Sequence, residues 1–145
     1  MTAQRRWCMK AGLPAGSLAC RLNHMQDFLT WRGGFEGTTL ADEVRLMERD
    51  ARALKLALRR EVPGASEVED AVRKISKAMK PKGLPLDEAL KEARNAVVVA
   101  QRTLKAAIEK ASKTKCQGAG LPSEIDTYFR SGEFRAKEAG LAGRR

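Results

Sequence analysis

The chain has few aromatic residues, a single histidine and no long apolar run. Aromatic residues make up 5% of its 145 residues. No apolar run approaches the roughly 20 residues that a membrane-spanning helix needs, so an integral membrane protein is not expected. Motifs for nucleotide binding or for catalysis are also missing from the sequence. We therefore expect a protein that is not an enzyme, has no small-molecule substrate and needs no cofactor.

Closely spaced cysteine pairs are absent as well. The three cysteines, Cys8, Cys20 and Cys116, are odd in number and far apart, which argues against a secreted disulfide framework and favours a reducing compartment. Cys20 and His24 lie four residues apart, but zinc sites usually bring ligands in close pairs. Catalysis by this pair would need a third group and a cleft that the sequence does not indicate. We expect three idle thiols and no metal site.

Positive charge is in clear excess. The chain has 28 Lys and Arg residues against 18 Asp and Glu residues, which gives a formal net charge of +10. The excess is spread along the chain, with no basic tail. Such a surface attracts polyanions, which include nucleic acids, acidic proteins and anionic lipid headgroups. The alternative is a solvated surface whose charge only aids solubility.

Helix-forming residues dominate the composition, and we predict an all-α fold. Apolar residues at steps of three and four predict helices over 39–62, 66–80 and 85–114. Short connections make neighbouring helices antiparallel. We therefore expect an antiparallel three-helix core within residues 38–117, with shorter helical arms at 1–37 and 118–145.

Several local features refine this prediction. Ser66 and Glu69 resemble a capping box that opens the second helix. The stripe of the third helix passes through Val97 without a break, and the apolar Val98 and Val99 beside it predict burial on more than one side. Leu18, Leu22, Met25 and Leu29 predict a helix over about 15–31. The tripeptide Gly-Leu-Pro starts at residues 12, 83 and 120 without a fixed period, and we interpret each copy as a helix boundary.

Basic residues gather near the C-terminal ends of two predicted helices. One or two cations per end would satisfy the helix dipole, but the chain supplies more. Contact with nucleic acid phosphates is the functional interpretation, and a solvated face is the alternative. The candidates are Arg73, Lys74, Lys77, Lys80 and Lys82 in one group and Lys105, Lys110, Lys113 and Lys115 in the other.

The aromatic residues lie outside the predicted core. Trp31 and Phe35 flank Arg32 and two glycines, an arrangement that can stack on unpaired bases, and Tyr128 and Phe129 follow the core. The favoured alternative is that the flanking segments bury these rings against the ends of the bundle.

The partner prediction combines these observations. We expect a structural subunit of a larger assembly that contacts RNA, for example in an organellar ribosome. The alternative is an accessory subunit of a membrane-associated respiratory or photosynthetic complex that binds acidic protein or lipid headgroups. Residues 1–26 contain no acid and four bases, a composition typical of organellar transit segments and also of an ordinary basic helix. A mitochondrial location is favoured over a plastid one, a cytoplasmic location is the alternative, and secretion is not expected.

Overall fold

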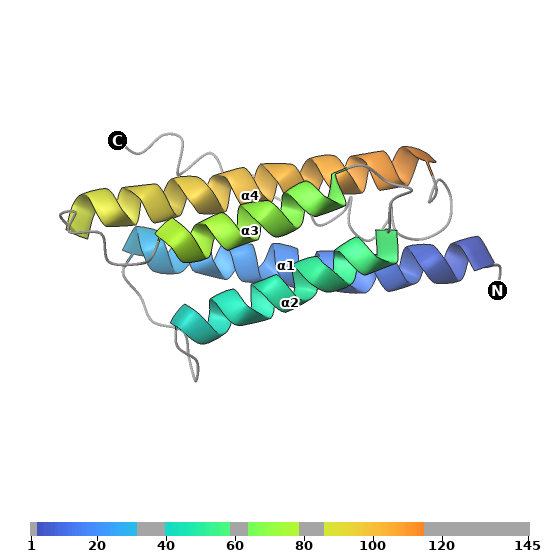
Figure 1. Ribbon diagram of the computed structural model, residues 1–145, viewed down its shortest axis with the longest axis horizontal. Coiled ribbons are helices and arrows are strands. Elements are labelled where there is room, and N and C mark those ends of the chain that lie inside the picture. Colours follow the sequence, from blue (N-terminus) through green and yellow to red (C-terminus); the bar gives the residue numbers. More distant parts are fainter. Residues whose placement is uncertain (1–2, 32–39, 59–63, 79–85, 115–145) are drawn as a thin grey trace.

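The computed structural model describes residues 3–31, 40–58, 64–78 and 86–114, and these residues form four helices (Figure 1). They are α1 (Ala3–Trp31), α2 (Leu40–Leu58), α3 (Ala65–Ala78) and α4 (Leu86–Thr114). The described part of the chain contains no strand, which confirms the predicted all-α class. None of these four helices has an apolar stretch long enough to cross a membrane.

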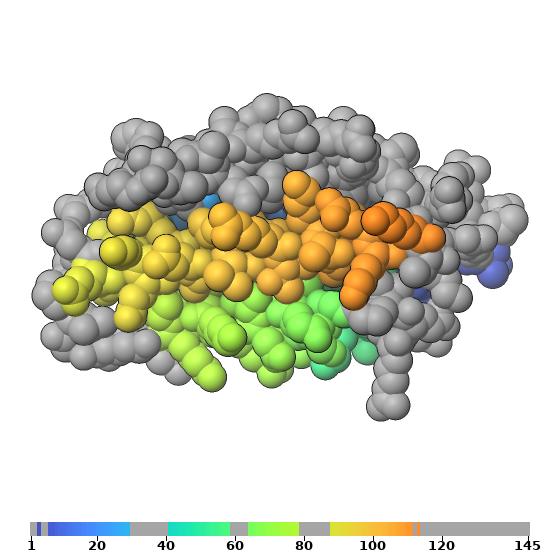
Figure 2. Space-filling view, turned by 90° about the horizontal axis from the view of Figure 1, so that it is seen from above, coloured from blue at the N-terminus to red at the C-terminus, as the bar shows by residue number. Residues whose placement is uncertain are grey.

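The helices form an up-down-up-down bundle. Helix α1 packs against α2 and α4, and α3 packs against the same two helices. Successive helices run in opposite directions, so the beginning of α1 and the end of α4 lie at the same end of the bundle (Figure 1). Figure 2 shows α4 and α3 along one face of the molecule.

The N-terminal segment differs from its prediction as a short arm. Helix α1 has 29 residues, and its side chains Leu18, Leu22 and Met25 are fully buried. The core therefore contains four helices in place of the expected three. The earlier half of α1 contributes mainly small side chains, of which Ala11 and Ala15 are fully buried. Small residues give only a weak hydrophobic signal in the sequence, although they allow helices to approach closely.

The first Gly-Leu-Pro copy lies inside α1, because Pro14 is an interior residue of that helix. Its interpretation as a helix boundary is wrong. Proline cannot donate the usual backbone hydrogen bond, which destabilises the helix locally. Packing of the neighbouring alanines Ala11 and Ala15 in the core outweighs this loss. The second copy directly precedes Leu86, the first residue of α4. Residues 83–85 and 120–122 lie outside the described residues.

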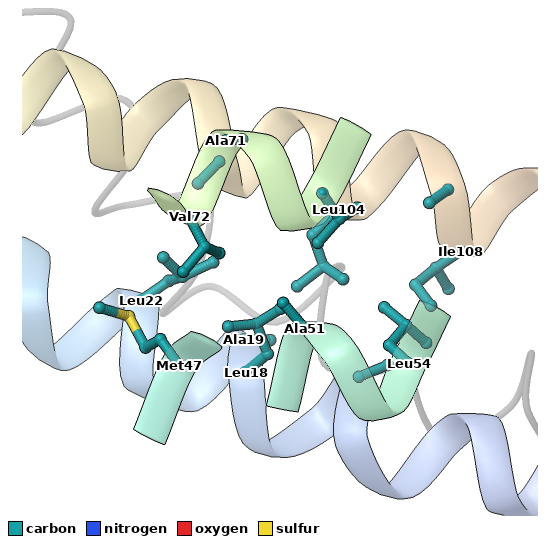
Figure 3. Close-up of a cluster of buried hydrophobic side chains, with 14 of the residues drawn as sticks. Leu18, Ala19, Leu22, Met47, Ala51, Leu54, Ala71, Val72, Leu104 and Ile108 are labelled. Atoms are coloured by element: carbon teal, nitrogen blue, oxygen red, sulfur yellow. The ribbon is translucent and has the colours of Figure 1, made fainter. Parts of the chain in front are cut away.

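The predicted apolar stripes of the other helices form the rest of the core. Helix α4 runs without a break through Val97, which is fully buried. Trp7 and Phe28 are partly buried and pack against this core. Figure 3 shows the central cluster, to which all four helices contribute: Leu18, Ala19, Leu22, Met47, Ala51, Leu54, Ala71, Val72, Leu104 and Ile108.

Burial of Val99 was predicted wrongly. Its side chain is 49% exposed, whereas Val98 is half-buried. Two residues along a helix correspond to a rotation of roughly 200°. Val99 therefore points away from the face on which Val97 is buried.

The start of α3 also differs from its prediction. The backbone N–H of Val68 donates to the carbonyl of Gly64 at 3.1 Å, and Gly64 has a φ of 110°. Ser66 lies inside the helix, exposed to solvent. Glu69 is buried and pairs with cations instead of closing a capping box. Gly64, and not Ser66, is therefore the N-cap residue, which directly precedes the first residue of α3.

Replacing Gly64 with alanine is expected to lower the free energy of unfolding by about 1–2 kcal/mol, because L residues rarely adopt this φ. Space is not the cause, since an added Cβ would lie an ordinary 3.5 Å from the Cβ of Ala107. Urea unfolding of the two proteins measures the difference. Ser66→Ala, in the exposed first turn of the same helix, is the control. An equal effect of the two changes would contradict the backbone explanation.

Candidate polyanion-binding surface

Three carboxylates of α2 and α3 turn inward. Glu43, Asp50 and Glu69 are each about nine-tenths or more buried. Helices α2 and α3 each contain as many acidic as basic residues, so their sequences show no excess of charge. Because the inward acids are hidden and the bases are not, the outer surface of these helices is more positive than the residue count indicates.

Asp50 and Glu43 hold α1 against α2. Arg21 donates from Nη1 to Oε1 of Glu43 at 2.8 Å and from Nε to Oδ2 of Asp50 at 3.3 Å. The hydroxyl of Ser17 donates to the same Asp50 oxygen at 2.7 Å. Arg49, on the outside of α2, reaches Oδ1 of Asp50 at 3.2 Å. Asp50 is therefore shared by groups from two helices.

Glu69 joins α2 to α3 and faces three cations. The Nζ of Lys55 lies 3.3 Å from its Oε1, and Nη2 of Arg73 lies 3.6 Å from the same oxygen. The Nε of Arg52 lies 3.8 Å from Oε2. One negative charge thus meets three positive ones, and the interface between α2 and α3 carries a positive surplus.

The outer face of α2 carries a row of arginines. Arg45, Arg49 and Arg52 follow one another at steps of four and three, which places them along one side of the helix. Their side chains are 73%, 63% and 59% exposed. Each pairs with a carboxylate, and Arg45 does so with Asp42, three residues before it. Arg49 and Arg52 thus pair with buried carboxylates, whereas the Asp42 partner of Arg45 has a side chain that is itself 44% exposed.

The structure separates the two predicted groups of basic residues. Arg73, Lys74 and Lys77 are exposed near the end of α3, whereas Lys110 and Lys113 are exposed near the end of α4, with Lys105 half-buried before them. Because α3 and α4 are antiparallel, these groups lie at opposite ends of the bundle (Figure 1). The side chain of Trp31 and the residues Arg32, Phe35, Lys80, Lys82, Lys115, Tyr128 and Phe129 lie outside the described part.

Sequence reasoning missed the arginine row of α2. Acidic residues alternate with the arginines in the segment from Asp42 to Arg52, so no basic cluster stands out. The available signal was the spacing, because Arg45, Arg49 and Arg52 occupy the side of the helix away from the apolar stripe.

A buried amide network between α1 and α4 was missed as well. Gln101 is fully buried and donates from Nε2 to Oδ1 of Asn23 at 2.9 Å. Gln26 donates from its Nε2 to Oε1 of Gln101 at 3.0 Å. Hydrogen bonds thus link all three side chains inside the bundle, and these bonds fix the register of α1 against α4.

Replacing Gln101 with alanine is expected to lower the free energy of unfolding by about 2–4 kcal/mol, because it opens a cavity and removes the hydrogen bonds that Gln101 makes to the buried Asn23 and Gln26. Thermal and urea unfolding measure this loss. Thr103→Ala is the control, since that exposed hydroxyl bonds only locally, to the carbonyl of Val99. A loss at Gln101 no larger than at Thr103 would show that the network adds no stability.

The cysteines differ from their prediction as three idle thiols. Cys8 is fully buried and disulfide-bonded, whereas Cys20 is exposed and unbonded. The Sγ of Cys20 lies 4.0 Å from Nε2 of His24, so these two side chains do share a face of α1. Cys116 lies outside the described residues. Within those residues, no three His, Cys, Asp or Glu side chains are grouped as a metal ion would require.

Comparison with protein-family models, curated proteins and solved structures finds no match to this chain. Its function is therefore inferred from the bundle itself. The bundle offers a rigid scaffold, a positive outer surface on α2 and α3, and basic groups at both of its ends.

Proposed function

We propose that the protein is a non-enzymatic structural subunit of a larger assembly and that it contacts RNA through phosphate groups. The observation that carries the proposal is the segregation of charge on α2 and α3. Glu43, Asp50 and Glu69 face inward. Arg49, Arg52 and Arg73, which pair with Asp50 or Glu69, are more than half exposed, whereas Arg21, which pairs with Glu43 and Asp50, is 26% exposed. Exposed guanidinium and ammonium groups on a rigid helical scaffold suit phosphate oxygens.

The proposed assembly is a ribonucleoprotein, for example an organellar ribosome. Basic residues at both ends of the bundle would allow contact with more than one RNA segment. A mitochondrial location is part of the proposal, although residues 3–26, whose basic, acid-free composition suggested it, belong to the core helix α1. Contacts to phosphate position a protein on RNA without reading its sequence, so little sequence preference is expected.

Crosslinking to RNA in native extract tests the proposal, together with nuclease treatment of the particle that contains the protein. The proposal requires a crosslink and a loss of co-migration after nuclease treatment. In the purified protein, replacing Lys77, Lys80 and Lys82 together with alanine is expected to weaken binding equally for unrelated RNA sequences. A loss confined to one sequence would contradict phosphate contact.

A second candidate function is that of an accessory subunit in a membrane-associated complex, binding acidic protein or lipid headgroups. The observation in its favour is a set of exposed apolar side chains. Leu13 is 76% exposed on α1 and Leu56 is 69% exposed on α2. Apolar side chains suit a protein surface better than they suit phosphates. Co-migration that survives nuclease treatment, without any crosslink, would favour this candidate.

A further inference from the structure

Helix α2 separates its charges more completely than α4 does. Its four acidic residues, Asp42, Glu43, Glu48 and Asp50, are buried or half-buried, and its three arginines are exposed. On α4, by contrast, the acidic residues Glu88, Glu92 and Glu109 are exposed among the lysines. An approaching anion would therefore meet mixed charge on α4 and mainly positive charge on the outer side of α2.

The arginines of α2 are also held in place. Arg49 binds Oδ1 of Asp50 through both Nε and Nη2, and Arg52 approaches Glu69 through Nε. A guanidinium has five N–H donors in a fixed plane, so binding a carboxylate on one side still leaves donors for a second anion. Tethering reduces the side-chain entropy that binding would otherwise cost.

The spacing of the three α2 arginines suits a chain in which anionic groups repeat at regular intervals. Residues three and four apart on a helix have Cβ atoms about 5–6 Å apart, and the stretch from Arg45 to Arg52 is about 10 Å long. Arg73 of α3 extends the positive surface beyond Arg52, because the two side chains share the carboxylate of Glu69. Such a series suits consecutive phosphates of one strand better than a single isolated anion.

We infer that Arg45, Arg49, Arg52 and Arg73, here called the arginine face, bind the sugar-phosphate backbone of a single RNA strand. This inference rests on the proposed function and names its contact surface. The buried Asp50 and Glu69 are positioning residues, which orient the guanidinium groups and do not touch the RNA.

The test compares two triple variants with the unmodified protein, using labelled oligouridine and labelled oligoadenine of equal length over a range of salt concentrations. One variant carries Arg45→Gln, Arg49→Gln and Arg52→Gln. The matched control carries Lys91→Gln, Arg94→Gln and Arg102→Gln, which removes the same charge from a part of α4 that contains none of the candidate phosphate contacts. The arginine variant is expected to bind both RNAs at least about tenfold more weakly, and its salt slope is expected to fall by about 0.7 for each lost contact. The α4 variant should change much less.

A third variant, with Arg45→Lys, Arg49→Lys and Arg52→Lys, separates loss of contact from loss of folding. It keeps the charge, so it should retain most of the salt slope while losing affinity that depends on guanidinium geometry. Equal weakening by the two glutamine variants would overturn the inference, because binding would then follow net charge alone. If the unmodified protein binds neither RNA, the proposed function itself fails. If it binds and the arginine variant binds equally well, only the placement on α2 fails.

Discussion

Replacing Leu22 with alanine is expected to lower the free energy of unfolding by about 2–5 kcal/mol, enough to unfold a marginally stable protein. Leu22 belongs to α1 and is fully buried, and Figure 3 shows it within the central cluster of the bundle. Truncation removes apolar area and leaves a cavity that the surrounding helices can fill only partly. Urea unfolding followed by circular dichroism measures the change.

Leu13→Ala provides the matched control on the same helix. Its side chain is 76% exposed, so the same chemical change is expected to alter the free energy of unfolding by no more than about 0.5 kcal/mol. Comparison of the two variants tests whether α1 packs in the hydrophobic core. If Leu22→Ala changed the free energy of unfolding as little as Leu13→Ala, the N-terminal segment would be an arm, and the prediction of a three-helix core would be correct.

The sequence predicts α2, α3 and α4 well because large apolar side chains mark their buried faces. Helix α3 is described to Ala78 and α4 from Leu86, and the predicted boundaries at residues 80 and 85 lie outside the described residues. The first half of α1 could not be found in the same way. Its buried residues there include Ala11 and Ala15, which contribute little hydrophobic signal, and Pro14 usually indicates a helix boundary.

The candidate surface was harder to predict than the helices, because net charge says nothing about which side of a helix each charge occupies. Glu69 illustrates the difficulty. Its position three residues after Ser66 suits a capping box, but in the bundle its carboxylate forms ion pairs with cations of α2 and α3. Only knowledge of the neighbouring helix distinguishes the two roles. The predicted candidates Arg73, Lys74 and Lys77 of α3 are exposed, yet the arginine row of α2 was missed, because the acidic residues between the arginines obscure their spacing in the sequence.

The disulfide of Cys8 has the second large expected effect, and the bundle geometry indicates its partner. Cys20 is unbonded, and the chain contains one further cysteine, Cys116. In the antiparallel pair of α1 and α4, Gln101 faces both Asn23 and Gln26. Along this antiparallel pair the same register puts the level of Cys8 near the end of α4, which is described to Thr114. Such a bond would tie the beginning of α1 to the end of α4.

Reduction of this disulfide is expected to lower the free energy of unfolding by about 4 kcal/mol, because the bond closes a loop of roughly 100 residues in the unfolded chain. For a protein of this size the loss corresponds to a fall in Tm of roughly 10–15 °C. Calorimetry with and without dithiothreitol measures the shift, and Cys8→Ser should reproduce it without reductant. Cys20→Ser should leave Tm unchanged, since that thiol is exposed and unbonded. Peptide mapping without reduction should recover Cys8 linked to Cys116; alkylation of Cys8 in the unreduced, unfolded protein would contradict the bond.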